Sequence, residues 1–335
     1  MSELRVPPPP ASLTREAMLR AMDRMIDGSM PAEEIATLLR TMAQRGESAV
    51  ELAAGVESLR RRVVALPVDP TLKLCDTCGT GGDRHQTFNI STLAALVAAA
   101  CGVRIAKHGN RAASSRCGSA DVLETLGLNL DASPERIAAS IRDVGFGFCF
   151  APRFHPAMKA VAPIRKQMGI RTIFNIIGPL ANPARITSQL VGVAEAHLLQ
   201  PIAETLVALR VRHALVVHGL DGLDEVTITG ATKALEVRNG EITRLTIAPE
   251  QLKVPRASLD ALRGGDPAEN ARIAREILGG AASPKSDMTA VNAACAIYVA
   301  DRAASIADGL AMAQAALREG RPLALLERVV AASRA

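Results

Sequence analysis

The sequence is poor in aromatic residues and has no tryptophan. Among its 335 residues there are six phenylalanines and one tyrosine. Proteins that bind single-stranded nucleic acid stack the bases on aromatic side chains, so this composition argues against nucleic acid as a partner. The formal net charge is +5. This charge suits anionic ligands such as phosphates without requiring nucleic acid.

Long apolar runs are also missing. No stretch of about 18 uncharged apolar residues occurs, so we expect no membrane span and no membrane partner. The first ten residues contain the run Pro7–Pro10 and no apolar core, so we expect no signal peptide. We therefore expect a cytoplasmic protein.

The six cysteines are scattered along the chain. In an unsecreted chain of this length we expect them to be free, buried thiols. Cys75 and Cys78 form a CxxC pair, but a structural zinc site would need a second pair with similar spacing, and the sequence has none. The histidines are also dispersed, which argues against a zinc site built from three of them.

Residues 13–65 have a helical pattern. The apolar residues between Ile35 and Met42 fall at positions i, i+3, i+4 and i+7, which is one face of a helix. Pro67 and Pro70 end this pattern. We therefore expect a small all-helical domain at the N-terminus. The expected boundaries are 1–70 for this domain, joined by part of 155–190, and 71–335 for a large second domain.

After residue 70, short apolar runs alternate with helical stretches. This alternation predicts an α/β fold in which helices cover a central, mostly parallel sheet, with the small helical domain packed on it. The expected strands are 73–76, 103–106, 146–150, 190–193, 214–218, 234–237 and 242–247. The expected helices are 92–101, 119–126, 134–143, 197–209, 267–278 and 289–303.

A glycine-rich segment, DTCGTGGD at 76–83, follows the first expected strand. Three glycines in four residues allow positive φ angles and a close approach of the backbone to a ligand. The segment is not a GxxxxGK[ST] loop. It also fails the dinucleotide-binding fingerprint, because Arg84 stands where the third glycine is needed. A plain tight turn is the alternative interpretation.

The next segment, Phe88–Thr92, leads into the expected helix 92–101. Hydroxyl groups and free N–H groups at the start of a helix form an anion site. Simple capping by Ser91 or Thr92 is the alternative. Because this helix start lies a few residues after the glycine-rich segment, we favour phosphate binding.

A loop with the sequence KHGNRAASS, at 107–115, follows the expected strand 103–106. It combines two cations, an amide and two hydroxyls, and its small residues keep the backbone accessible. A solvated, charged loop is the alternative. Ser119 then lies at the start of another expected helix, near the same loop.

Two further segments carry charge. VHGLDGLDE, at 217–225, follows a buried strand, and ligands of open α/β sheets bind at the carboxyl ends of strands. Its three carboxylates suit Mg²⁺, although a polar turn is the alternative. Arg165 could clamp a carboxylate through two hydrogen bonds, although a surface cation is the more common role of such an arginine. Since the sequence pairs no nucleophile with a base, we expect catalysis by positioning and charge stabilisation.

Five motifs in series resemble those of the anthranilate phosphoribosyltransferases of tryptophan biosynthesis. They are GTGGD at 79–83, NIST at 89–92, KHGNRAASS at 107–115, GPLANP at 178–183 and VHGLDGLDE at 217–225. The resemblance implies an α/β domain of the nucleoside phosphorylase and phosphoribosyltransferase type, packed on a small helical domain through which the protein forms a homodimer. It also implies a reaction that joins anthranilate to 5-phosphoribosyl 1-diphosphate and releases diphosphate.

The resemblance also implies roles for individual residues. The phosphoribosyl diphosphate is expected at Gly79, Gly82, Asp83, Thr87, Asn89, Ile90, Ser91 and Thr92. Its diphosphate and ribose phosphate are expected at Lys107, His108, Gly109, Asn110, Arg111, Ala112, Ala113, Ser114, Ser115 and Ser119. Asn110 and Arg165 are expected to contact anthranilate, and His108 and His155 to line its channel. Two Mg²⁺ ions are expected at Ser91, Asp224 and Glu225. The residues expected to act in catalysis are Lys107, Asn110 and Arg165.

Elementary chemistry agrees with these roles. The leaving diphosphate carries charge that Mg²⁺ and Lys107 would neutralise, while the anomeric carbon gains oxocarbenium character. The amine of anthranilate is neutral at pH 7, so no strong base is required. Two alternatives stay open at this point. One is a pyrimidine nucleoside phosphorylase, and the other is a non-catalytic, nucleic-acid-binding relative with the same fold.

Overall fold

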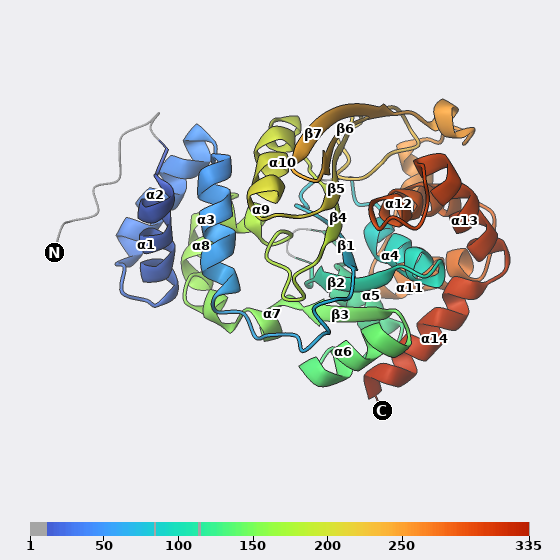
Figure 1. Cartoon of the computed structure of the whole chain (residues 1–335), viewed down its shortest axis with the longest axis horizontal. Coiled ribbons are helices and arrows are strands. Elements are labelled where there is room, and N and C mark those ends of the chain that lie inside the picture. The colour runs from blue at the N-terminus through green and yellow to red at the C-terminus, as the bar shows by residue number, and fades with distance from the viewer. Residues whose placement is uncertain (1–11, 84, 113–114, 335) are drawn as a thin grey trace.

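The computed structural model describes residues 12–83, 85–112 and 115–334 of the chain. At one end lie three helices, α1 (Arg15–Ile26), α2 (Ala32–Arg45) and α3 (Ala49–Arg60). Two short helices from the middle of the chain, α8 (Ala162–Met168) and α9 (Ile173–Ile177), pack against them (Figure 1). The helical part therefore combines segments that lie far apart in the sequence.

A buried carboxylate fixes the start of α3. Ser48 and Glu51 form a capping box, in which each side chain accepts a hydrogen bond from the backbone of the other residue. Glu51 is fully buried, and its Oε1 atom also accepts from the backbone N–H of Leu13 at 2.8 Å and from Arg45 Nη2 at 2.7 Å. One side chain thus ties together the beginning of the described chain, the end of α2 and the start of α3.

The centre of the molecule is a seven-stranded sheet with the order β3-β2-β1-β4-β5-β6-β7. The first five strands in this order are parallel, and β6 and β7 are added antiparallel. The strands are β1 (Leu74–Gly79), β2 (Arg104–Gly109), β3 (Phe146–Phe150), β4 (Ser188–Gly192), β5 (His213–Gly219), β6 (Thr232–Arg238) and β7 (Glu241–Ile247). The expected fold class and all seven expected strands are confirmed, with differences of a few residues at most of their ends.

Alternate residues of the central strands enter two different cores. Leu190 and Leu215 point into a core formed with helices on one face, whereas Val191 and Val216 point into a core shared with the helical part. Side chains of a strand alternate between faces, so strands covered on both sides are apolar at successive positions. The helical part therefore covers one face of the sheet.

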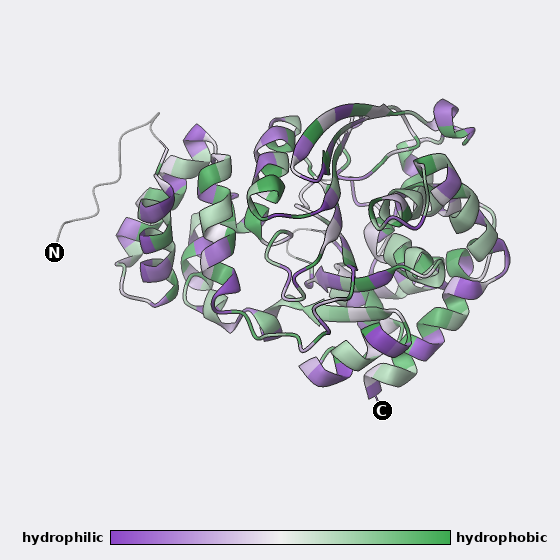
Figure 2. Ribbon diagram, viewed as in Figure 1, coloured by the Kyte–Doolittle hydropathy of each residue, from purple (hydrophilic) through white to green (hydrophobic). Residues whose placement is uncertain are grey.

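The opposite face is covered mainly by α4 (Ile90–Ala100) and α12 (Pro284–Val299). Most residues of α4 are buried, and the helix is mostly green in Figure 2. The other helices of the large domain are α5 (Ser119–Thr125), α6 (Pro134–Asp143), α7 (Ala151–Phe154), α10 (Leu199–Ala208), α11 (Pro267–Leu278), α13 (Ile306–Arg318) and α14 (Arg321–Arg334). In the described part of the chain, no helix combines the length and the apolar character needed to cross a bilayer.

The expected helix boundaries were right for α6 and α11 and wrong for α12. We expected α12 to cover 289–303, but it begins at Pro284 and ends at Val299. Ser283 caps it by accepting a hydrogen bond from the backbone N–H of Ser286, and proline at the first helical position is compatible with a helix start. The cap therefore decides where this helix begins.

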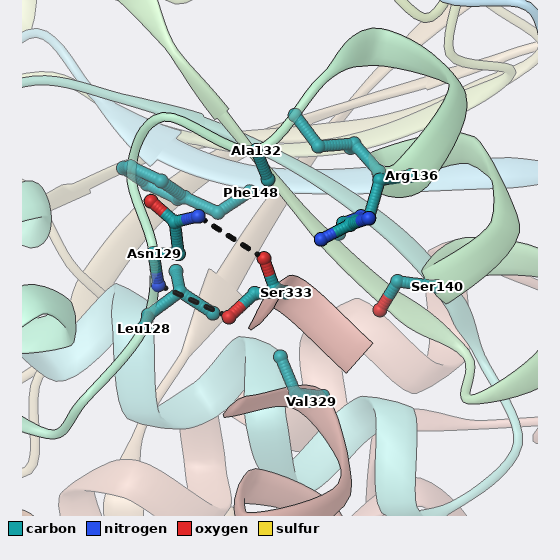
Figure 3. A pocket seen from close by; sticks show the side chains of 10 residues that line it. Leu128, Asn129, Ala132, Arg136, Ser140, Phe148, Val329 and Ser333 are labelled. Carbon is teal, nitrogen blue, oxygen red and sulfur yellow. Dashed lines mark hydrogen bonds between the residues drawn. The ribbon is translucent and has the colours of Figure 1, made fainter. Parts of the chain in front are cut away.

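A shallow pocket lies where α14 meets the connection between α5 and α6 (Figure 3). Ser333 accepts a hydrogen bond through Oγ from the backbone N–H of Asn129 at 3.0 Å, and through its carbonyl from the Asn129 side chain at 3.3 Å. The lining residues include Leu128, Phe148 and Val329 and none of the residues expected in the functional site. We therefore interpret it as a packing feature of the C-terminal helix.

Candidate functional site

Four neighbouring parallel strands each end in glycine, at Gly79, Gly109, Gly192 and Gly219. Because β1, β2, β4 and β5 are parallel, their carboxyl ends lie at one edge of the sheet. Ligands of open α/β sheets bind at this edge. Three segments singled out in the sequence continue from these ends, so the sheet itself gathers them.

Asp224 connects two of these segments. Its Oδ2 atom accepts a hydrogen bond from the backbone N–H of Gly81 at 2.8 Å. A Cβ atom on Gly79 would overlap the carboxylate of Asp224, and one on Gly192 would overlap its backbone carbonyl. The absence of side chains at these two strand ends thus makes room for Asp224.

Ser91 connects the remaining segments. Its backbone N–H, at the start of α4, donates to Glu225 Oε1 at 3.2 Å. Its hydroxyl oxygen lies 3.4 Å from Lys107 Nζ. The segments around residues 79–83, 89–92, 107 and 224–225 therefore lie together, as expected from the sequence, and in this structure a carboxylate occupies a helix start that was expected to bind phosphate.

Lys107 is a buried cation beneath this edge of the sheet. It is 1% exposed, and Nζ donates to the backbone carbonyl of Thr77. Asp76 is fully buried and accepts hydrogen bonds from the backbone N–H of His108 at 3.2 Å and from Asn182 Nδ2 at 2.8 Å. Burial raises the pKa of Asp76, and the charge of Lys107 opposes that rise. Polar groups of the protein thus already surround the buried charge of Lys107 before any ligand binds.

The carboxylates of Asp83, Asp224 and Glu225 lie close to one another and near Lys107. Burial, and then the charge of Asp83, raise the pKa of Asp224. Burial and the charge of Asp224 likewise raise the pKa of Glu225. A divalent cation would relieve this repulsion, because it favours the ionised form of both groups. The donor set therefore fits a cation.

The same carboxylates do not enclose a cation by themselves. In the part of the chain that the structure describes, no three His, Cys, Asp or Glu side chains are arranged to hold a metal. Mg²⁺ typically binds one or two carboxylates and completes its shell with water and substrate phosphates. Asp224 and Glu225, next to the hydroxyl of Ser91, fit that open kind of site.

Two histidines, His108 and His155, lie against each other next to Lys107. The ring centroids of His108 and His155 are 5.0 Å apart, and both side chains are buried. Burial lowers the pKa of His108 to about 3 and that of His155 to about 4, so both rings are neutral near pH 7. The Nε2 atom of each ring is buried and has no hydrogen-bond partner among the described residues. A neutral imidazole has one donor and one acceptor nitrogen, so each ring can accept one hydrogen bond from a ligand.

Arg165 is a half-buried cation without a carboxylate partner among the described residues. Its guanidinium lies 5.3 Å from the centroid of the Phe174 ring, and Nη2 is 3.5 Å from Asn175 Oδ1. Burial lowers the pKa of Arg165. An arginine in this state can bind a planar carboxylate through two hydrogen bonds.

Two of the expected binding residues already have protein partners. Arg111 forms ion pairs with Asp121 at 3.1 Å and Glu124 at 2.7 Å, so its guanidinium is directed at α5. Asn89 donates to the Cys117 carbonyl at 3.1 Å and accepts from Asn270 at 2.9 Å. These side chains hold the surrounding loops in place, which the sequence did not predict.

The other expected residues line or support the same edge. Ile90 and Thr92 are buried in the first turn of α4, and Thr87 forms a β-bridge with Arg263. Gly109 packs against Phe148, and Asn110 and Ala112 lie in the loop after it. Ser115 donates to the Cys117 carbonyl at 3.4 Å, and Ser119 to that of Asn110 at 3.3 Å. Ala113 and Ser114 lie outside the described residues.

Sequence reasoning assigned no role to three residues that shape this site. Asp76 and Asn182 support the strand that carries Lys107, and Arg171 donates to the Gly81 carbonyl at 3.0 Å. Asp76 and Asn182 lie in the motifs at 76–83 and 178–183, whereas Arg171 lies in none of the motifs found in the sequence. Their contacts depend on which strands and loops are neighbours in space, and the sequence does not reveal this.

Two family models match the chain. The model of the glycosyl transferase family, helical bundle domain, covers residues 10–63, and that of the glycosyl transferase family, a/b domain, covers residues 71–323. The two matches fall on the helical part and on the part that contains the sheet.

Curated relatives and solved structures are similar over nearly the whole chain. An anthranilate phosphoribosyltransferase of Thermomicrobium roseum is 47% identical, with 96% of this chain and 92% of the relative covered. A crystal structure of anthranilate phosphoribosyltransferase from Thermus thermophilus has a TM-score of 0.92 at 44% identity, with 97% of each chain covered. The Saccharomyces cerevisiae enzyme, in complex with PRPP and Mg, has a TM-score of 0.85 at 26% identity, with 96% of this chain and 92% of that chain covered.

Proposed function

The chain belongs to the glycosyl transferase family that includes the anthranilate phosphoribosyltransferases, and on this premise we propose the reaction that it catalyses. It transfers the phosphoribosyl group of 5-phosphoribosyl 1-diphosphate to the amine of anthranilate. The products are N-(5-phosphoribosyl)anthranilate and diphosphate, and the step belongs to tryptophan biosynthesis.

One structural observation supports this proposal independently of the family match. A glycine-rich loop, a helix start, a buried lysine and two acidic residues meet at the carboxyl ends of parallel strands, through the contacts of Gly81 with Asp224 and of Ser91 with Glu225 and Lys107. Such a site suits a substrate with a diphosphate group and its cation.

We propose that Asp224, Glu225 and Ser91 hold Mg²⁺, with two ions bound. When bound, Mg²⁺ neutralises charge on the diphosphate. The backbone at Gly79–Asp83 and at the start of α4 binds the phosphoribosyl diphosphate. Lys107 lies within 3.4 Å of the Ser91 hydroxyl and adds positive charge next to the leaving group.

The acceptor side would position anthranilate. Arg165 binds its carboxylate, and Asn110 orients its amine. The neutral rings of His108 and His155, whose Nε2 atoms have no partner among the described residues, can accept hydrogen bonds from the N–H groups of this amine. The bond between C1 of ribose and the diphosphate oxygen breaks, the nitrogen lone pair forms the new C1–N bond, and the amine then releases one proton. Positioning and charge stabilisation are sufficient for this chemistry.

The assay that tests the function follows the fluorescence of anthranilate while purified protein consumes it. We expect consumption that requires both 5-phosphoribosyl 1-diphosphate and Mg²⁺, with diphosphate formed in equal amount. Phosphorolysis of thymidine or uridine in place of this reaction would contradict the proposal and favour a nucleoside phosphorylase. A gel shift with nucleic acid at physiological salt, without turnover, would favour a binding protein.

Two further proposals concern the assembly and the location of the protein. We propose that the protein is a homodimer through its helical part, which light scattering would measure. We also propose the cytoplasm as its location.

A further inference from the structure

Arg171 lies in the turn between α8 and α9, in a segment to which the proposed function gives no role. Its side chain reaches the glycine-rich loop, where Nη1 donates to the carbonyl of Gly81 at 3.0 Å. A Cβ atom on Gly82 would lie 2.7 Å from the same nitrogen. The guanidinium and the loop are therefore in direct contact, which only a residue without a side chain permits at position 82.

The peptide groups on either side of Gly81 are held by two different parts of the molecule. The N–H of Gly81 donates to Asp224 Oδ2 at 2.8 Å, and its C=O accepts from Arg171. Gly81 and Gly82 have φ angles of 66° and 86°, which non-glycine residues rarely adopt. Because glycine can adopt many backbone conformations, these two hydrogen bonds restrain the loop at Gly81.

The backbone of Arg171 lies close to Arg165, the residue proposed to bind anthranilate. The next residue, Thr172, is the N-cap of α9, and its N–H donates to Asn175 Oδ1 at 3.1 Å. The same oxygen lies 3.5 Å from Arg165 Nη2. Arg171 therefore extends from the segment that carries Arg165 to the loop that contacts Asp224.

Arg171 forms no close ion pair among the described residues that would explain its position. The carboxylate recorded closest to it belongs to Glu195, at 3.9 Å, and that side chain is 49% exposed. Nη2 of Arg171 is buried and has no partner among the described residues. An exposed pair at this distance contributes little to stability, so the bond to Gly81 is its main interaction.

We propose that Arg171 is a positioning residue, which fixes the glycine-rich loop, and through it Asp224, from the segment that binds the acceptor. The proposal rests on the proposed function and deepens it. Without Arg171 the carbonyl of Gly81 loses its partner, and the loop must be ordered when the phosphoribosyl diphosphate and Mg²⁺ bind. Arg165 keeps its own contacts. Binding of 5-phosphoribosyl 1-diphosphate should therefore weaken more than binding of anthranilate.

The test uses the full-length protein with Arg171→Met, which keeps a flexible, unbranched side chain and removes the hydrogen-bond donors. A hydrogen bond from a charged donor is worth roughly tenfold or more in an equilibrium. We expect the KM for 5-phosphoribosyl 1-diphosphate and the half-saturating Mg²⁺ concentration to rise about tenfold, while the KM for anthranilate changes less than about threefold. Arg171→Lys keeps a charged donor and should recover part of the loss.

A matched control is Arg104→Met. Arg104 also donates to backbone carbonyls, those of Ile141 at 3.1 Å and Arg142 at 2.6 Å, but from the opposite end of β2. We expect its KM values to equal those of the wild type. If Arg171→Met has the same KM values as this control, the proposal is wrong. The same holds if Arg171→Met fails to fold and Arg171→Lys loses thermal stability with unchanged KM values.

The wild-type assay separates this inference from the proposed function. If the wild type does not consume anthranilate, the proposed function fails. Calorimetric titration of 5-phosphoribosyl 1-diphosphate in the presence of Mg²⁺ then still tests Arg171, because binding needs no acceptor. An unchanged dissociation constant in Arg171→Met would overturn the inference, and a weaker one would support it.

Discussion

The backbone carbonyl of Asp224 lies directly against the α-carbon of Gly192, with no room for a side chain between them. Gly192 is the last residue of β4, and Asp224 lies in the connection between β5 and β6. The end of a central strand therefore determines where this carboxylate lies. Its position does not depend on the loop alone.

Replacing Gly192 with alanine should displace Asp224. The added methyl group would overlap the carbonyl of Asp224, so the connection between β5 and β6 must move. This movement would take the Asp224 carboxylate away from the position in which it acts. We expect Mg²⁺-dependent turnover to fall about a hundredfold with little change in the circular dichroism spectrum. Gly230→Ala is the control, since a Cβ there meets nothing within 4 Å. Equal activity of the two variants would contradict this account.

Removing the charges of Asp224 and Glu225 should weaken the response to magnesium. In Asp224→Asn combined with Glu225→Gln, neutral amides replace the anionic donors that Mg²⁺ prefers. We expect the half-saturating Mg²⁺ concentration to rise by orders of magnitude, measured by titration of turnover. Asp260→Asn, at an acid 80% exposed in its side chain, is the control. A titration that overlays the wild-type curve would refute the metal assignment.

Replacing Arg165 with alanine should affect one substrate only. The guanidinium is expected to bind the carboxylate of anthranilate, and a charge-assisted pair of hydrogen bonds is worth roughly 1.5–3 kcal/mol. We expect the KM for anthranilate to rise about tenfold to a hundredfold, and that for 5-phosphoribosyl 1-diphosphate to change less than about twofold. Lys166→Ala, at the next and exposed residue of α8, should leave both unchanged. An equal rise in both values would argue against the acceptor role.

The buried His108 should make stability depend on pH. Burial lowers its pKa from the ordinary 6.5 to about 3 in the folded protein. As the pH falls below 6.5 the unfolded chain takes up the proton while the folded protein does not, so the free energy of unfolding decreases. The slope for one such group is about 1.4 kcal/mol per pH unit.

Urea unfolding of the wild type and of His108→Gln between pH 7 and pH 4.5 would measure this contribution. Below pH 6.5, the slope of the free energy of unfolding against pH should be smaller in the variant by about 1.4 kcal/mol per pH unit, because glutamine does not titrate. His197→Gln, at a histidine whose side chain is 64% exposed, should keep the wild-type slope. A slope unchanged in His108→Gln would contradict the assignment of a buried, neutral imidazole.

The sequence predicted the sheet well because each strand carries its own signal. Apolar residues at successive positions, as at Leu190 and Val191, indicate a strand buried on both faces, and turn residues bound it. The boundaries of α12 were predicted wrongly, and its start is set by the cap at Ser283. Local chemistry thus accounts for the elements and for most of their ends.

The candidate site was predictable only where its residues are contiguous. The motifs at 79–83, 107–115 and 217–225 each include the carboxyl end of a strand, and the sheet brings them together as expected. The contacts of Asp76 with Asn182 and of Arg171 with Gly81 join residues about a hundred positions apart, so no local pattern indicates them. Each of these contacts depends on the order of the strands.

The position of β1 has a consequence for how the protein is made. This strand lies between β2 and β4, and Cys75 is paired with Ile105 on one side and with Ser188 on the other. A ribosome has therefore released β1, β2 and β3 long before the second neighbour of β1 emerges. During that interval the nascent chain exposes the unpaired edge of β1, and a fragment that stops before Asp224 cannot assemble the proposed metal site, however well its helical part has folded.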